Sequence, residues 1–148
     1  MESKAIKVKH YQAWFSAETM HSNSIKWLSQ LRFVKDEQQF LDDLVKSYTL
    51  KLIDSKHFAK SKTIVRQLNR LQKETHILID SIVKHEKTLQ IMVDGINQIQ
   101  EENAYRAAHI KLKSQVGDFF IKYRSLKTQL FSLIKGIIKE EKQNRLLE

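Results

Sequence analysis

The stretch of residues 61–99, SKTIVRQLNRLQKETHILIDSIVKHEKTLQIMVDGINQI, decides the fold. Large residues recur in it at steps of three or four, which is the spacing of one face of an α-helix. This row comprises Ile64, Leu68, Leu71, Thr75, Leu78, Ile82, His85, Leu89, Met92, Ile96 and Ile99. The stretch has no proline and, before Gly95, no glycine, so its backbone pattern is uninterrupted. It therefore predicts one long helix from about Ser61 to Ile99.

Rows of the same kind lie on both sides of this stretch. The first comprises Trp27, Leu31, Val34, Leu41, Val45, Tyr48 and Leu52, and a flanking row of Phe33, Glu37, Phe40 and Leu44 widens it. The third comprises Tyr105, Ala108 or His109, Leu112, Val116, Phe119, Tyr123, Leu126, Leu130, Leu133 and Ile137. Short polar side chains at 21–24 could cap the start of the first helix. Polar runs at 54–57 and 100–103 are the predicted turns, with a charged tail from Lys139 to Glu148.

The whole chain of 148 residues has no proline and only three glycines, so it can form a few long helices. Short turns make neighbouring helices antiparallel. We therefore predict an all-α fold: an antiparallel up-down-up bundle of three long helices, forming a single domain over 21–148. Residues 1–20 form a partly ordered N-terminal segment, in which Trp14 and Phe15 could add a short helix or pack onto the bundle. The residues expected in the core include Leu68, Leu71, Leu78, Ile82, Leu112, Phe119, Leu126 and Leu130.

Composition narrows the classes of function. There is no cysteine, which excludes disulfides, thiol nucleophiles and zinc–cysteine sites. No window approaches the ~18 uninterrupted apolar residues of a membrane-spanning helix, and the start of the chain lacks the apolar core of a signal peptide. These features favour a cytoplasmic protein without a transmembrane segment. We expect no cofactor.

Polar residues on or beside the apolar rows raise the question of a metal site. If the second turn centres near 101–102, His109 lies level with Asp94 and close to Glu18 and His21. Glu18 and His21 also form a Glu-x-x-His unit, but a di-iron bundle needs two such units and two further glutamates. Glu18, His21, Asp94 and His109 are thus the candidate metal ligands of an incomplete set. The simpler interpretation makes His85 and His109 boundary residues that pack their rings and bond one nitrogen to a carboxylate or water.

The net charge of +9 directs attention to basic surfaces. Lys62, Arg66, Arg70 and Lys73 follow steps of four, four and three, so they form a stripe on one side of the second helix. No acidic residue occurs between Lys56 and Lys73. Such a stripe could bind the phosphates of a nucleic acid or an anionic membrane. It lacks interleaved aromatic residues and any nucleic-acid-binding motif, which is typical of a plain solvated face.

The third helix carries large apolar residues outside its main row, at Ile110, Ile121, Phe131 and Ile138. Four such residues at roughly helical spacing suggest a second contact face. That face could receive the N-terminal segment, a protein partner or a second copy of the chain.

The pattern Trp27-x-x-x-Leu31-x-Phe33-x-x-x-Glu37-x-x-Phe40 resembles the opening of a group of small uncharacterised helical proteins from Bacteroidetes-type bacteria. The pattern covers about a tenth of the chain. The resemblance implies a bacterial cytosolic origin and implies no site.

Three functions remain compatible with these features. The first is a non-enzymatic interaction or structural bundle that self-associates. The second is a basic surface for nucleic acid or anionic membrane, and the third is a metal-binding bundle of histidines and carboxylates. An enzyme is not expected, because no nucleophile–base pair, phosphate-binding glycine loop or pair of acids in a cleft can be recognised.

Overall fold

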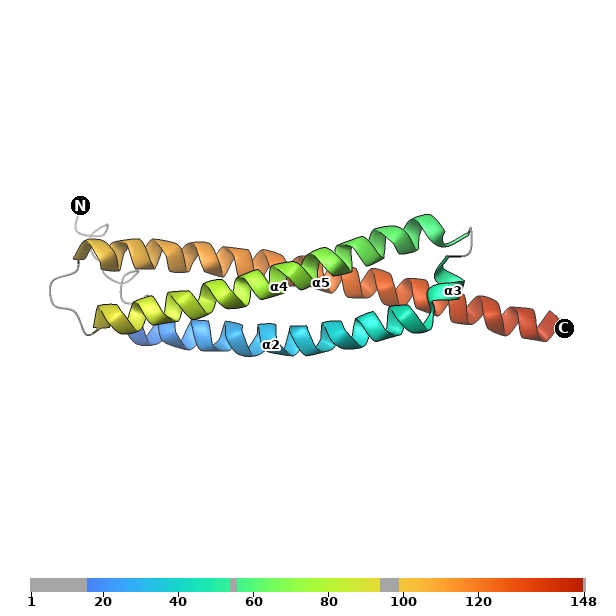
Figure 1. Ribbon diagram of the computed structural model, residues 1–148, viewed down its shortest axis with the longest axis horizontal. Helices are drawn as coiled ribbons and strands as arrows, with labels where there is room; N and C mark the ends of the chain where they lie inside the picture. The colour runs from blue at the N-terminus through green and yellow to red at the C-terminus, as the bar shows by residue number, and fades with distance from the viewer. Residues whose placement is uncertain (1–15, 54–55, 94–98, 148) are drawn as a thin grey trace, which may run out of the picture. The chain divides into compact units, whose positions relative to one another are not determined.

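The computed structural model describes residues 16–53, 56–93 and 99–147, and all its regular structure there is α-helical (Figure 1). The helices are α2 (Ala17–Ser47), the short α3 (Thr49–Leu52), α4 (Phe58–Val93) and α5 (Ile99–Leu147). Successive long helices reverse direction, which confirms the predicted all-α antiparallel bundle. The suggested short N-terminal helix, with Trp14 and Phe15, lies outside the described residues. None of the described helices is both long enough and apolar enough to cross a membrane.

The helix ends differ from the predicted ones. The first helix begins at Ala17 and not at 21–24, because the Ser16 hydroxyl accepts a hydrogen bond from the backbone N–H of Thr19 (3.3 Å) and so caps the helix earlier. At the other end of the chain, the expected charged tail is part of α5 as far as Leu147.

The second turn was also misplaced. Residues 100–103, expected to form it, already belong to α5, which begins at Ile99. Glu101 and Glu102 lie in the first turn of that helix, where the helix dipole favours negative charge. Ile99 was expected in the core and is exposed.

The contacts divide the chain into two compact units. Unit 1 contains Met1–Phe33 and Ile77–Val116, and unit 2 contains Val34–His76 and Gly117–Glu148. Each unit is built from one segment of each of the three long helices, lying side by side (Figure 1). Every interaction that follows lies within one unit.

The predicted rows supply the core of both units. All eight core residues named from the sequence are buried, and Ile82 and Phe119 have no exposed surface. The flanking row of the first helix was wrong in part, since Phe33 and Phe40 are exposed. Three helices can cover only the inner part of each helix circumference, and these two residues lie beyond it.

Pairings between helices establish their directions in unit 2. Gln38 of α2 donates a buried hydrogen bond to Thr75 of α4 (3.0 Å). Farther along, the Ser61 hydroxyl of α4 lies 2.8 Å from the backbone carbonyl of Leu52, at the end of α3. Residue numbers thus increase along α2 and α3 in the direction in which they decrease along α4, so α4 runs antiparallel to α2 and α3.

Candidate functional site

A chain of hydrogen bonds crosses unit 1 through all three of its helical segments. Asn23 of α2 places Nδ2 3.3 Å from Nε2 of His109 on α5. The other ring nitrogen of His109, Nδ1, lies 3.0 Å from Nε2 of His85 on α4. We call Asn23, His109 and His85 the histidine link. His109 is fully buried and His85 nearly so, so the link belongs to the core.

Aromatic rings enclose the histidine link. Trp27 stacks on His109 with ring centroids 4.8 Å apart, and Tyr105 stacks on His85 at 3.9 Å with nearly parallel planes. This enclosure disfavours the charged imidazolium. Burial, with smaller contributions from His85 and Lys113, lowers the pKa of His109 to about 4. Burial likewise lowers the pKa of His85, although the neighbouring Glu86 opposes that shift.

Glu86 is a buried carboxylate beside the histidine link. Its Oε2 lies 2.6 Å from Nδ1 of the partly exposed His21 on α2. Its Oε1 and the hydroxyl of Tyr105 are buried without a hydrogen-bond partner among the described residues. Burial, together with the charge of Glu86, raises the pKa of Tyr105, so the phenol stays protonated. Unit 1 therefore holds several polar groups in its core, including these two atoms that have no hydrogen-bond partner among the described residues.

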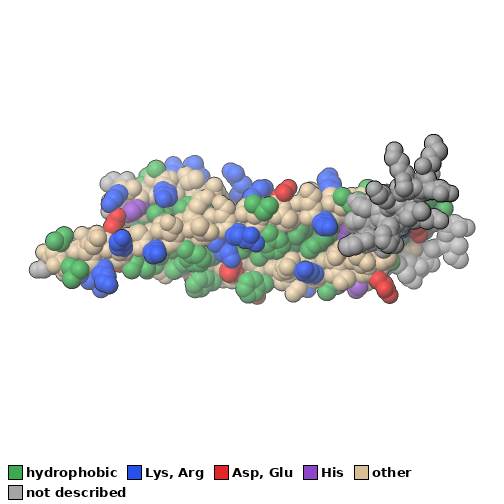
Figure 2. Space-filling view, turned by 180° about the vertical axis from the view of Figure 1, so that it is seen from behind, with side chains coloured by type: hydrophobic (Ala, Val, Ile, Leu, Met, Phe, Trp, Pro, Cys, Tyr) green, Lys and Arg blue, Asp and Glu red, His purple; other side chains and the backbone are tan. Residues whose placement is uncertain are grey.

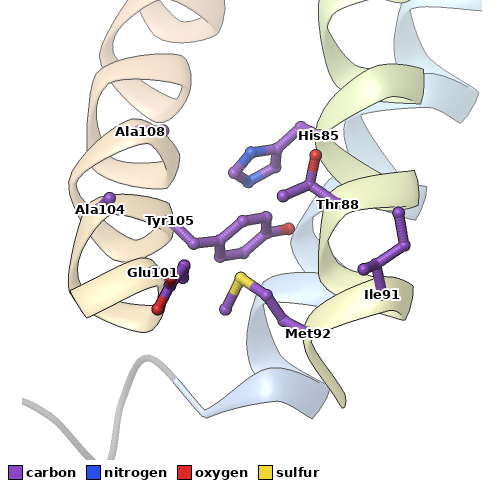
Figure 3. Close-up of a pocket in the computed structure, with 8 residues that line it drawn as sticks. All are labelled: His85, Thr88, Ile91, Met92, Glu101, Ala104, Tyr105 and Ala108. Atoms are coloured by element: carbon purple, nitrogen blue, oxygen red, sulfur yellow. The ribbon is translucent and has the colours of Figure 1, made fainter. Parts of the chain in front are cut away.

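A pocket of about 510 Å³ opens beside the histidine link, between α4 and α5 (Figure 3). Figure 3 shows the His85 ring directly above Tyr105, with Met92 and Thr88 on α4 and Glu101 on α5. The Thr88 hydroxyl donates to the backbone carbonyl of Lys84 (3.1 Å) and is engaged there. Of the three residues of the histidine link, His85 lines this pocket.

The four candidate metal ligands have separate surroundings. Glu18 is exposed, His21 bonds to Glu86, and His109 bonds to His85 and Asn23. Asp94 lies outside the described residues. Across residues 16–53, 56–93 and 99–147, no three His, Asp or Glu side chains are grouped so that they could hold a metal ion. The expected pairing of His109 with Asp94 rested on the misplaced second turn, and His109 in fact meets His85.

The basic stripe of Lys62, Arg66, Arg70 and Lys73 lies in unit 2, and all four residues are exposed. None of them forms an ion pair with a described residue, although Lys62 lies 5.8 Å above the ring of Phe58. Figure 2 shows Lys and Arg side chains spread over the face in view, with hydrophobic side chains between them. The stripe thus keeps its positive charge available to solvent.

The four residues of the expected association face are exposed but do not form one face. Ile110 belongs to unit 1, and the other three belong to unit 2. Phe131 and Ile138 are seven residues apart and share one side of α5, whereas Ile121 is rotated by about 80° from Phe131. Ile121 instead lines a groove of about 370 Å³ between α4 and α5, together with Arg70 and Lys122.

Phe131 and Ile138 flank the seam between α5 and α2. One turn before Phe131, Lys127 forms an ion pair with Glu37 of α2 (2.9 Å), which also accepts a hydrogen bond from Tyr123 (2.6 Å). One and two turns beyond Glu37 lie Phe40, which is 58% exposed, and the half-buried Leu44. We call Phe40, Leu44, Phe131 and Ile138 the α2–α5 apolar face.

Part of these two sites was predictable from the sequence. The predicted candidates included His85, His109, Phe131 and Ile138, but the pairing of the two histidines and the exposure of Phe40 were not predicted. The spacing of Phe33 and Phe40, seven residues apart and outside the main row, was the signal for an outward face.

No protein-family model matches this chain, and comparison with curated proteins and with solved structures found no match. The resemblance to small bacterial helical proteins therefore stays a prediction. Function has to be argued from the residues themselves.

Proposed function

We propose that this chain is a non-enzymatic interaction protein that self-associates through the α2–α5 apolar face of unit 2. The observation that carries the proposal is the exposure of Phe40 (58%), Phe131 (45%) and Ile138 (47%) on two neighbouring helices. Isolated exposed apolar residues need no explanation, but a group beside one seam is typical of a contact surface. A second copy of the chain is the partner proposed, since closed twofold dimers are the commonest assembly.

The exposed area sets the expected strength. Fully burying one large apolar side chain contributes roughly 1.5–3 kcal/mol, so half-exposed side chains contribute roughly half of that. Three such residues from each of two copies yield roughly 5–9 kcal/mol, against association costs of at least ~4 kcal/mol. The balance is at most about 5 kcal/mol, which favours a weak dimer that forms only at concentrations of roughly hundreds of micromolar or higher. The Glu37–Lys127 ion pair at one end could fix how two copies align.

Sedimentation velocity over a range of concentrations tests the proposal. The wild type should shift towards a dimer as concentration rises, and Phe131→Lys should remain monomeric. Ile77→Lys is the matched control, because Ile77 is also a large exposed apolar residue (63%) but lies on α4, outside the α2–α5 apolar face. This control should associate like the wild type.

Two results would contradict self-association. One is a wild type that stays monomeric at high concentration. The other is a wild type that dimerises only after removal of residues 1–15, which would assign the apolar face to the N-terminal segment. Equal weakening by Phe131→Lys and Ile77→Lys would also count against the α2–α5 apolar face.

The basic stripe supports a second candidate function, the binding of phosphate-bearing surfaces. Its four cations are exposed and lack ion pairs to described residues, so binding a polyanion breaks no such pair in the protein. Fluorescence anisotropy with labelled DNA and RNA, and sedimentation with anionic vesicles, should then show binding that weakens steeply with salt. The slope of the logarithm of the binding constant against the logarithm of the salt concentration reports the number of phosphates bound. Charge reversal of Arg66 and Arg70 should reduce the size of this slope by about one for each phosphate that the variant no longer binds. Reversal of Lys111 and Lys113, in unit 1, should leave the slope unchanged.

A further inference from the structure

The histidine link has a definite direction of hydrogen bonding. The Asn23 amide nitrogen can only donate, so Nε2 of His109 must accept. A neutral His109 then carries its proton on Nδ1 and donates it to Nε2 of His85. His85 in turn carries its own proton on Nδ1. Two neutral rings thus join α2, α5 and α4, and each of the two contacts has one donor and one acceptor.

The same geometry predicts how the link responds to added protons. One proton can be accommodated if Nε2–H of His85 donates to Nδ1 of His109 and the Asn23 amide turns to present its oxygen to Nε2–H of His109. A second proton places two N–H groups against each other across 3.0 Å, with no acceptor between them. It also places two like charges in one enclosed site.

We propose that the histidine link is a proton-operated latch, which holds the three helical segments of unit 1 together while its rings are neutral or share one added proton, and which opens when both rings are protonated. This device goes beyond self-association, because it acts in unit 1 and does not use the α2–α5 apolar face of unit 2.

Charged and titratable neighbours face the link from each packed element. His21 faces it from α2 and Glu86 from α4, where they bond to each other. From α5 come Tyr105, which remains a neutral phenol, and Lys113, whose positive charge disfavours protonation of His109. Glu86 favours a proton on His85, whereas burial and the neighbouring His85 and Lys113 disfavour a proton on His109. The two rings should therefore titrate in two separate steps.

The acid response of unit 1 should be separable from that of unit 2. In unit 2, Glu37 and Glu140 have pKa values lowered below 4.5, so stabilisation from their ionised forms is lost only below that pH. In unit 1, His109 binds its proton near pH 4 when folded and near 6.5 when unfolded. Stability contributed by the neutral ring thus falls as the pH drops from about 6.5 towards 4.

Nuclear magnetic resonance of the imidazole nitrogens, on the full chain, is the first test. At pH 7.5 both His85 and His109 should be Nδ1–H tautomers. On acidification they should take up protons in two steps, both below 6.5, the ordinary pKa of histidine. Uptake of both protons in one step, or uptake by both rings already at pH 6.5 or above, would overturn the proposal, and this test requires no variant.

Hydrogen exchange from pH 7 to 4.5, corrected for the chemical exchange rate, is the second test. The opening constant of the unit 1 helices should rise on the order of 50–100-fold at pH 4.5, from the difference between the folded and unfolded pKa of His109. Unit 2 should change far less over this range. Equal changes in both units would overturn the latch.

Asn23→Asp is the matched variant, because it keeps the size of the side chain and replaces the amide by a carboxylate. The new charge should stabilise a protonated His109, so acid-induced opening of unit 1 above pH 4.5 should be largely abolished. Asn69→Asp, on an exposed position of α4 in unit 2, adds the same charge elsewhere and should open like the wild type. Acid opening that is unchanged in Asn23→Asp would contradict the role of the link.

Discussion

Replacing the two described glycines of α5 by alanine should stabilise the protein. Gly117 and Gly136 lie inside α5, and a Cβ atom built at either position meets no other atom within 4 Å. Alanine therefore adds no clash, and it reduces the conformational entropy that the unfolded chain loses on folding. Each replacement should contribute about 0.8–1.0 kcal/mol. The two sites are far apart along one helix, so the double variant should gain about 1.6–2 kcal/mol.

Chemical denaturation and calorimetry measure this gain. At about 2–4 °C per kcal/mol for a chain of this size, the double variant should melt about 3–8 °C higher than the wild type. Ala107→Gly, at an exposed position of the same helix, is the reverse control and should destabilise the protein by about 1 kcal/mol. If Gly117→Ala or Gly136→Ala lowered stability, the backbone there would not be the open, regular helix described above.

Three further outcomes are expected. Leu126→Ala should lower the free energy of unfolding by about 2–5 kcal/mol in denaturant titrations, because Leu126 is 1% exposed and its truncation leaves a cavity. A variant as stable as the wild type would show that this side of α5 does not face the core. Tyr123→Phe should lower the free energy of unfolding by about 1.5–3 kcal/mol, because the hydrogen bond to Glu37 is lost. Carboxyl titration by nuclear magnetic resonance should then show a higher pKa for Glu37, and an unchanged pKa would refute that hydrogen bond. Partial burial alone would raise the pKa of Glu37, but Tyr123 and Lys127 outweigh burial and lower it. The ionised Glu37 should therefore stabilise unit 2 above pH 4.5, and this stabilisation should be lost as the pH falls below 4.5. Hydrogen exchange in unit 2 that accelerates already at pH 6 would contradict this pH dependence.

Much of this structure follows from the chain alone. The absence of proline and the steps of three and four make long helices the only regular structure consistent with the pattern. The same periodicity predicted the buried Leu68 and Phe119 and the exposed basic stripe. These properties depend on residues close in sequence, so local backbone preference and hydrophobic spacing are sufficient to predict them.

The pairing of residues on different helices was decided by the tertiary structure. The turn before α5 is not marked by proline, and α5 begins at Ile99, so the register between α4 and α5 at His109 moved by nine residues, about two and a half helical turns, from the predicted one. That shift replaced the expected contact of His109 with Asp94 by the contact with His85. A helical row shows which side of a helix faces inward, but it does not show how far one helix slides along the next. Packing of the three helices sets that position, and with it the histidine link.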